Sequence, residues 1–152
     1  RNYVTWREVA FFPTYHGDPG IDLNTVWLAN LDYDHDGRIN AMEYALGGDP
    51  QNGDVAARPI AYEIVEIAGQ FYPTITFAQQ IAADDLEYDV FVSDDLESWA
   101  VNGDGGGPYT TAPVELSLND DGTRQVRVRG LVPLGSINAK PYMQLVITLN
   151  QQ

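Results

Sequence analysis

The sequence predicts a mainly β protein, an antiparallel β-sandwich of the jelly-roll or immunoglobulin-like kind, preceded by a small helical head. Three observations predict this fold class. From about residue 60 onward, apolar residues recur with a period of two, which is typical of half-buried strands. An Asp-Gly pair at 121–122 separates two such runs, as it does in a β-hairpin. Before residue 50 the apolar spacing is helical instead, and an acidic loop interrupts it.

The first helix is expected from Asn2 to Phe12. Tyr3, Trp6 and Ala10 recur there at helical spacing, so that they share one face of the helix. We expect Trp6 to belong to the core for this reason. Pro13 is expected to end the helix, because proline lacks the N–H that a helix interior needs.

Two further short helices are expected in the head. One runs from about Leu23 to Leu31 and places Trp27 in the core just before the acidic loop. The other runs from about Asn40 to Leu46 and stops at Gly47-Gly48, with Pro50 shortly after, which is a common C-terminal stop signal. The head therefore occupies residues 1–56.

Residues 57–152 are expected to form the β-sandwich, packed together with the head as one unit. Six or seven short antiparallel strands fit this length, separated by turn residues such as Ala68-Gly69 and Asp120-Asp121-Gly122. The alternating runs are 60–64, 71–77, 86–92, 114–118, 126–128 and 143–149.

The charge of the chain limits its partners. The formal net charge is −14 and the pI is about 4.1, so nucleic acid and anionic membrane surfaces are poor partners. No apolar run approaches the roughly 20 residues of a membrane span, so we expect no membrane insertion. The absence of cysteine excludes disulfides and zinc–thiolate sites. The chain opens at Arg1 without a visible signal peptide, and we expect it to be part of a larger protein.

The acidic loop matches the EF-hand calcium pattern. Counted from Asp32, carboxylates stand at positions 1, 3 and 5 (Asp32, Asp34, Asp36), Gly37 at position 6 and Glu43 at position 12. Ca²⁺ is a hard cation that takes about 6–8 oxygen ligands, and alternate residues of a tightly wound loop can direct oxygens to one centre. The pattern predicts an EF-hand-like calcium loop, and Mg²⁺ fits it less well.

The remaining positions of the loop have expected roles too. Arg38 would contribute its backbone carbonyl, Asn40 would ligate directly or through water, and Glu43 would close the site with both oxygens. Ile39 is expected to point away from the ion into apolar packing. Because no second calcium loop is present in the sequence, the apolar side of this unit should pack on the sandwich.

Catalysis has little support in the sequence, and we expect no enzyme. His16 and His35 are the only histidines, and there is no cysteine. The sequence contains no Gly-x-Ser-x-Gly elbow, phosphate-binding loop or His-Glu-x-x-His motif. With 22 acidic residues, an acid pair cannot be assigned from sequence.

Aromatic residues are the other resource for binding. Neutral sugars stack on exposed rings, and Tyr109, Tyr72, Tyr33 and Trp99 are candidates because they lie near loops or strand ends. Tyr109 follows a glycine run and is the first choice for an exposed ring. Trp99 is expected instead to close one end of the sandwich.

Several segments together resemble a known kind of module. They are the Asp-x-Asp-x-Asp-Gly loop from Asp32, the run Glu43-Tyr44-Ala45-Leu46-Gly47, Asp49-Pro50, and the segment from Ser93 to Trp99. The chain resembles C-terminal accessory modules of large secreted proteins from verrucomicrobia and planctomycetes, in which a dockerin- or thrombospondin-type-3-like calcium loop precedes a β-sandwich. This resemblance implies an extracellular, non-catalytic role.

Three functions remain open at this stage. The first, which we favour from the sequence, is a carbohydrate-binding accessory module of a secreted protein, with a polysaccharide ligand. The second is a protein–protein or cell-surface attachment module. The third is a structural spacer stiffened by calcium. A contiguous row of exposed aromatic rings would favour the first, and an apolar patch or open sheet edge would favour the second.

Overall fold

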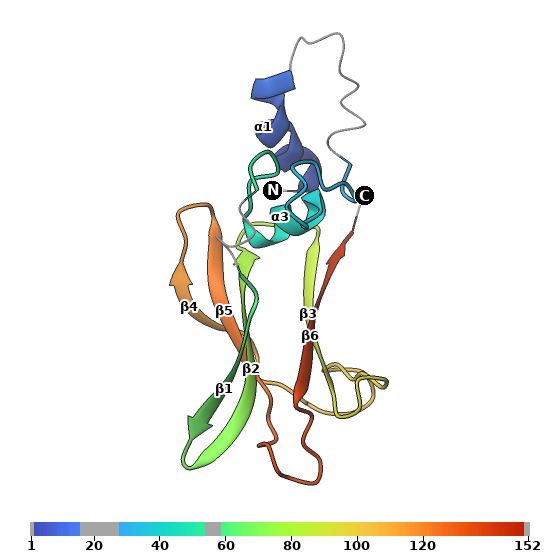
Figure 1. The fold of residues 1–152 in the computed structure, drawn as a ribbon, viewed down its shortest axis with the longest axis vertical. Coiled ribbons are helices and arrows are strands. Elements are labelled where there is room, and N and C mark those ends of the chain that lie inside the picture. Colours follow the sequence, from blue (N-terminus) through green and yellow to red (C-terminus); the bar gives the residue numbers. More distant parts are fainter. Residues whose placement is uncertain (1, 16–27, 54–58, 151–152) are drawn as a thin grey trace.

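The computed structural model describes residues 2–15, 28–53 and 59–150. In these ranges the chain is mainly β, with antiparallel sheets and two short helices, in agreement with the class predicted from sequence (Figure 1). The elements in chain order are α1 (Tyr3–Tyr15), α3 (Asn40–Leu46), β1 (Ala61–Ile67), β2 (Gln70–Gln80), β3 (Leu86–Ser93), β4 (Val114–Leu118), β5 (Thr123–Arg129) and β6 (Tyr142–Leu149).

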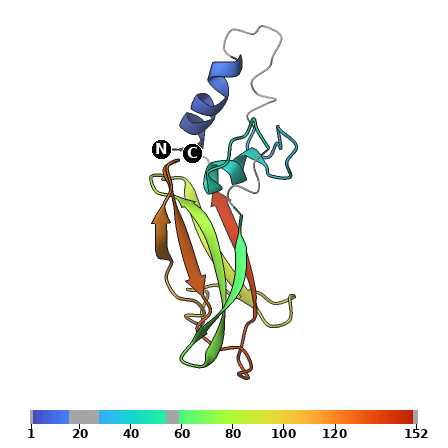
Figure 2. The ribbon, with the colours of Figure 1, turned by 60° about the vertical axis from the view of Figure 1, so that its left-hand side comes forward.

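The strands form two antiparallel sheets of unequal width. One sheet has four strands in the order β1-β2-β5-β4, and the other pairs β3 with β6. The predicted hairpins are confirmed, because Ala68-Gly69 joins β1 to β2 and Asp120-Asp121-Gly122 joins β4 to β5. Both helices lie beyond one end of the strands (Figures 1 and 2).

Apolar side chains from both sheets meet in one core. Its buried members come from β2, β3, β5 and the end of α3, and partly buried side chains of β6 pack against them. The alternation seen in the sequence explains the choice of face, since successive side chains of a strand point to opposite sides. The core contains Leu46, Ile75, Phe77, Val90, Val126 and Val128, with Met143, Leu145 and Ile147 beside them.

Strand β2 departs from the expected alternation. Its residues from Pro73 to Ala78 are all buried, including those on the face away from the core. Long side chains of β5 cover that second face. Arg127 Nε donates to Thr76 Oγ1 at 3.3 Å, and the Arg129 guanidinium lies 4.4 Å from the centre of the Tyr72 ring. Arginine side chains of β5 thus cover a face of β2 that the sequence pattern marks as exposed.

The first helix is longer than predicted. It extends to Tyr15, past Pro13, which was wrongly expected to end it. A proline removes only its own donor, so the helix can continue for a final turn beyond it. Asn2 caps the start, since its Oδ1 accepts from Thr5 N at 3.0 Å.

The aromatic face of α1 forms a second core cluster. Trp6 is buried, as predicted, and packs with Tyr3 and Tyr44 at ring-centre distances of 5.4–5.6 Å. The helix expected from Leu23 to Leu31, with Trp27, lies mostly outside the described residues, and Leu28–Leu31 form a turn. The boundary expected between residues 56 and 57 also lies outside them.

Helix α3 matches the prediction at both ends, with one correction. It ends at Gly47, whose left-handed backbone (φ 82°) closes the last turn. The prediction that Ile39 is buried in apolar packing is wrong, because its side chain is 38% exposed. Ile39 is the residue before the helix, with extended backbone (ψ 153°), and this conformation leaves its side chain at the surface.

The head is joined to the sheets through the C-terminal end of α3. Leu46 belongs to the core between the sheets. The backbone carbonyls of Tyr44 and Ala45 accept from Gln80 Nε2 and Tyr88 Oη, both at 2.7 Å. Burial raises the pKa of Tyr88 to about 12, so the hydroxyl remains a donor at ordinary pH. Among the described residues, no helix is long and apolar enough to span a bilayer.

Replacing Tyr88 by Phe tests this junction. The Tyr88 hydroxyl donates to Ala45 and accepts from Gln80 N at 3.1 Å, so its loss leaves two backbone groups without their partner. We expect the free energy of unfolding to fall by about 1–3 kcal/mol in urea denaturation. Tyr62→Phe, at an exposed tyrosine, is the control and should change it little. Equal stability of the two variants would contradict the assignment.

Candidate metal centre

The acidic loop links Leu31 to the start of α3. Two of its residues, His35 (φ 62°) and Gly37 (φ 95°), have left-handed backbone. A side chain at Gly37 would meet no atom within 4 Å, so the conformation and not the available space calls for glycine. Further backbone bonds fix the exit of the loop, since Asn40 N donates to Leu31 O at 2.6 Å.

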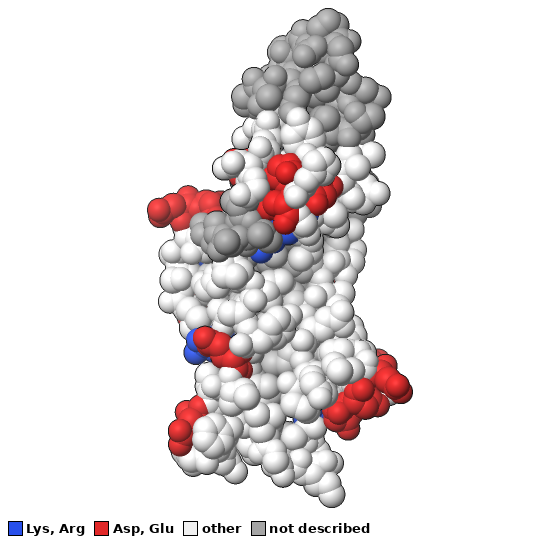
Figure 3. Space-filling view, in the orientation of Figure 1, with Lys and Arg blue, Asp and Glu red and all other residues white. Residues whose placement is uncertain are grey.

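Three aspartates converge at the centre of the loop. Carboxylate oxygens of Asp32, Asp34 and Asp36 lie within 4.8 Å of one another. The loop's own backbone orients them. Gly37 N donates to Asp32 Oδ2 at 3.0 Å, Asp36 N donates to Asp34 Oδ1 at 3.3 Å, and Arg38 N donates to Asp36 Oδ1 at 2.8 Å. Acidic side chains gather on the head in Figure 3, over the segment that contains this loop.

The electrostatics of the three aspartates favour a cation. Burial raises the pKa of the Asp34 carboxyl, the charges of Asp36 and Asp32 raise it further, and the Asp36 N–H opposes the shift. Asp34 Oδ2 is buried and accepts no hydrogen bond from the described residues. A buried carboxylate oxygen is costly unless a donor or a cation meets it. A divalent cation at the centre of the three aspartates would meet this need and reduce the repulsion.

The structure directs other predicted ligands toward the interior of the head. Asn40 is buried, its Nδ2 donates to Leu28 O at 2.9 Å, and its side chain hydrogen-bonds the Tyr3 hydroxyl. Glu43 is also buried and packs against Gly48, where an added Cβ would lie 2.9 Å from Glu43 Oε1. Three of the five predicted side-chain ligands therefore surround one point, whereas Asn40 and Glu43 are fully buried.

Tyr3 belongs to this inner layer and was not predicted to be near the site. Burial raises the pKa of its hydroxyl, and the Glu43 carboxylate raises it too, whereas Arg7 and the hydrogen bond with Asn40 oppose the shift. The signal in the sequence was the helical spacing of Tyr3 and Trp6, which predicted a buried face but not the element it covers. Arg38 is likewise buried, although only its carbonyl was expected to matter.

The four aromatic candidates for sugar binding do not form one surface. Tyr33 packs edge-on against Phe11 at 5.6 Å in the head, whereas Tyr72 lies on β2 beneath Arg129. Tyr109, expected to be exposed, is half-buried over its glycine run, because a Cβ at Gly107 would lie 2.9 Å from its ring. Trp99 is half-buried as well. Among the side chains that the structure describes, the large exposed aromatic ones are instead Tyr62, Phe71 and Tyr142.

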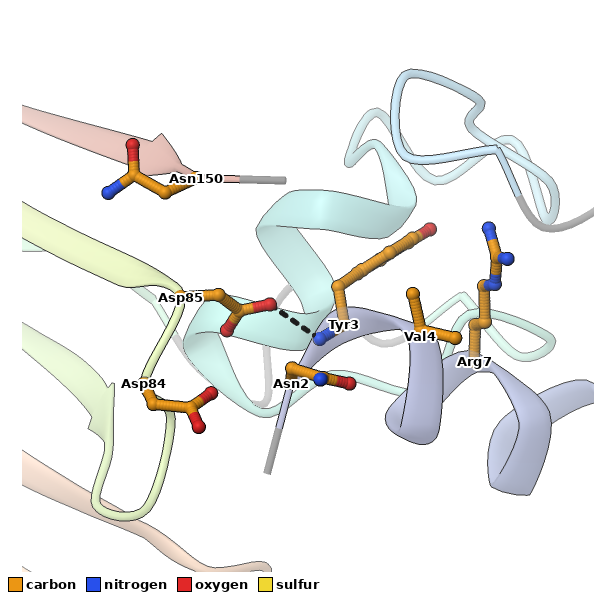
Figure 4. A pocket seen from close by; sticks show the side chains of 7 residues that line it. All are labelled: Asn2, Tyr3, Val4, Arg7, Asp84, Asp85 and Asn150. Carbon is orange, nitrogen blue, oxygen red and sulfur yellow. Dashed lines mark hydrogen bonds between the residues drawn. The ribbon is translucent and has the colours of Figure 1, made fainter. Parts of the chain in front are cut away.

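A pocket of about 300 Å³ lies where the start of α1 meets the loop between β2 and β3 (Figure 4). Asp85 is its central polar residue. Asp85 Oδ2 accepts from Tyr3 N at 2.6 Å and Oδ1 accepts from Tyr44 Oη at 2.8 Å, so each oxygen fixes part of the head. A carboxylate at a helix N-terminus also suits the helix dipole. We interpret this pocket as a structural junction.

Replacing Asp34 by Asn should have opposite effects with and without cation. In chelator, removal of one of three crowded charges should raise the melting midpoint by roughly 1–3 °C. In saturating Ca²⁺ the same change should lower the midpoint and weaken binding about tenfold or more, because an oxygen with full charge is lost. Asp104→Asn, an equal charge change at an exposed loop residue, is the control. Thermal melts and calorimetric titration measure both effects, and a change of the same sign in both conditions would refute the site.

Comparison with known proteins returned no match among protein-family models, curated proteins or solved structures. The resemblance to accessory modules of secreted proteins therefore rests on the residues quoted from the sequence. The case for a function rests on the geometry of the loop and of the sheets.

Proposed function

We propose that the protein is a calcium-stabilised, non-catalytic accessory module of a secreted protein, with an EF-hand-like loop fixed to a β-sandwich. The observation that carries this proposal is the convergence of Asp32, Asp34 and Asp36 within 4.8 Å. They stand at positions 1, 3 and 5 of a loop whose left-handed glycine is at position 6. The shared core supports the sandwich, since buried side chains of both sheets meet there.

Calcium fits this centre better than magnesium. Ca²⁺ accepts about 6–8 oxygens in a flexible arrangement, whereas Mg²⁺ demands a tight octahedron and keeps its waters. The aspartates supply three carboxylates, and we infer that the Arg38 carbonyl, Asn40 and Glu43 complete the set when the ion is bound. An extracellular location suits such a site, because extracellular modules of this kind bind Ca²⁺ at about 10⁻⁴–10⁻³ M.

The position of α3 explains how a cation would stabilise the whole module. The loop leads directly into α3, and the other end of α3 is bound to Gln80 and Tyr88 of the sheets. Ordering of the loop should therefore stabilise the junction as well as the head. A cation that binds only the folded state stabilises it by RT ln(1 + [L]/Kd).

A polysaccharide is the second candidate for what the module binds. Its specific support is the exposure of Tyr62 (59%) and Phe71 (50%), rings that lie on adjacent strands and face the same side of the sheet. Retention on insoluble cellulose, xylan, mannan or chitin, lost in Tyr62→Ala, would favour it. An enzymatic role has no comparable support among the described residues.

Thermal melts in Ca²⁺ and in chelator test the proposed function. We expect a stabilisation of about 2.7 kcal/mol at a hundredfold excess of Ca²⁺ over Kd, and a smaller one with Mg²⁺. The double variant Asp32→Asn/Asp36→Asn should abolish the shift. Far-ultraviolet circular dichroism and the combined fluorescence of Trp6, Trp27 and Trp99 should report one midpoint, because the head and the sheets share the α3 junction. Identical midpoints in Ca²⁺ and in chelator would overturn the proposal.

A further inference from the structure

The unequal width of the two sheets leaves part of the four-stranded sheet uncovered. Tyr62 and Ile64 of β1 pair directly with Ile75 and Pro73 of β2, so they point to the same face as the buried Ile75. Yet Tyr62 is 59% exposed and Ile64 is 62% exposed. This face of the sheet is therefore covered at β2 but uncovered at β1, one strand further out.

A groove of about 390 Å³ occupies this position, between β1–β2 and the start of β6. Its side chains are mainly apolar, and it is lined by Tyr62, Ile64, Pro73, Pro141 and Met143, with Glu63 and Thr74 at its side. Figure 3 shows this side of the molecule, where the surface between the two sheets is largely uncharged and carboxylates gather around it.

The edge of the narrow sheet next to the groove has unpaired backbone. Strand β6 pairs with β3 along its whole length, and no other described strand pairs with its second side. Half of its residues therefore direct N–H and C=O groups outward on that side. The outer edge of β3 differs, because Val92 and Ala100 exchange hydrogen bonds of 2.8 and 2.9 Å there.

We propose that this groove binds an extended segment of a partner protein, which adds to β6 as a third strand of the narrow sheet. A strand added to β6 would lie about 4.8 Å from it in the same sheet, and stacked sheets lie about 10 Å apart. Because β1 and the start of β6 line the same groove, the added strand would lie over β1. Its alternate side chains would cover Tyr62 and Ile64. Main-chain hydrogen bonds would supply affinity and the groove would select apolar residues at alternate positions.

Charge identifies the chemistry of this segment. The chain has a formal net charge of −14. At the border of the groove, Arg127 is paired with Glu63 at 3.3 Å and Lys140 with Asp94 at 3.7 Å, so these cations are already neutralised. A segment with lysine or arginine at its ends is attracted, and an acidic one is repelled. A second copy of this chain would bring the same negative charge, so the occupant is a basic partner.

Peptide binding tests the proposal. The probe is a fluorescent peptide of about ten residues with alternating Val and Thr and two Lys at each end, measured by anisotropy. A peptide with Glu in place of Lys, and one with the same composition but the Val residues consecutive, are the comparisons. We expect only the first to bind, and its affinity to fall as salt is raised. Alternate amides of β6 should exchange hydrogen more slowly in the complex.

Two matched variants separate the groove from general charge. Ile64→Glu should weaken binding about tenfold or more, although the added negative charge alone would favour a basic peptide. Leu118→Glu makes the same change at an equally exposed position (67%) on β4 and should leave binding unchanged. Thermal melts should show both variants folded.

Several results would overturn the inference. They are absence of binding by the Lys peptide, equal effects of the two variants, or unchanged exchange in β6. Sedimentation that shows a dimer broken by Ile64→Glu would assign the groove to a second copy instead. Competition by a neutral oligosaccharide would assign it to a glycan. None of these results depends on the metal centre, whose own test is the calcium-dependent melt.

Discussion

The rest of the structure depends on the hydrogen bonds that side chains of the sheets donate to the last carbonyls of α3. A helix of seven residues leaves most of its carbonyls without helical partners and is not stable alone. Here the Tyr44 and Ala45 carbonyls accept from side chains of β2 and β3. The chain then turns at Gly47, where an added Cβ would lie 2.6 Å from Asp121 Oδ2 of the β4–β5 turn. The helix end thus contacts three separate parts of the β region.

The same short helix connects this junction to the candidate metal centre. Asn40 and Glu43 occupy its first turn and are buried beside Tyr3, while Leu46 occupies its last turn in the core between the sheets. Because α3 spans only these two turns, a displacement at one end cannot be absorbed before it reaches the other. The apolar side of α3 is covered by the sheets, which pack on Leu46, and by the aromatic face of α1, which packs on Tyr44.

Much of the fold was predictable, because a sheet with one buried face imposes a period of two on its sequence. The six strands and the two hairpin turns follow from that period, and the stop of α3 follows from Gly47. The errors have identifiable causes. Ile39 was expected to be buried because its loop position points away from the ion, but here it precedes the helix with extended backbone. At the site, loop spacing predicted the three aspartates, whereas the side chain of Asn40 hydrogen-bonds Tyr3, which is distant in sequence.

The exposed face of β1 shows a more general limit of such patterns. Alternation in β1 and β2 is similar, and in both it specifies which side chains face the core. It carries no information on whether the opposite sheet is wide enough to reach them. That width depends on how many strands pair with β3 and β6, and only two strands form this sheet among the described residues. Tyr62 and Ile64 therefore have the sequence signature of core residues and the exposure of surface residues.

An apolar face beside an unpaired strand edge is a site where a natural protein otherwise places charge, proline or a covering segment. The presence of this apolar face on a chain this acidic, at a position where a third strand would fit, favours a partner strand as its cover.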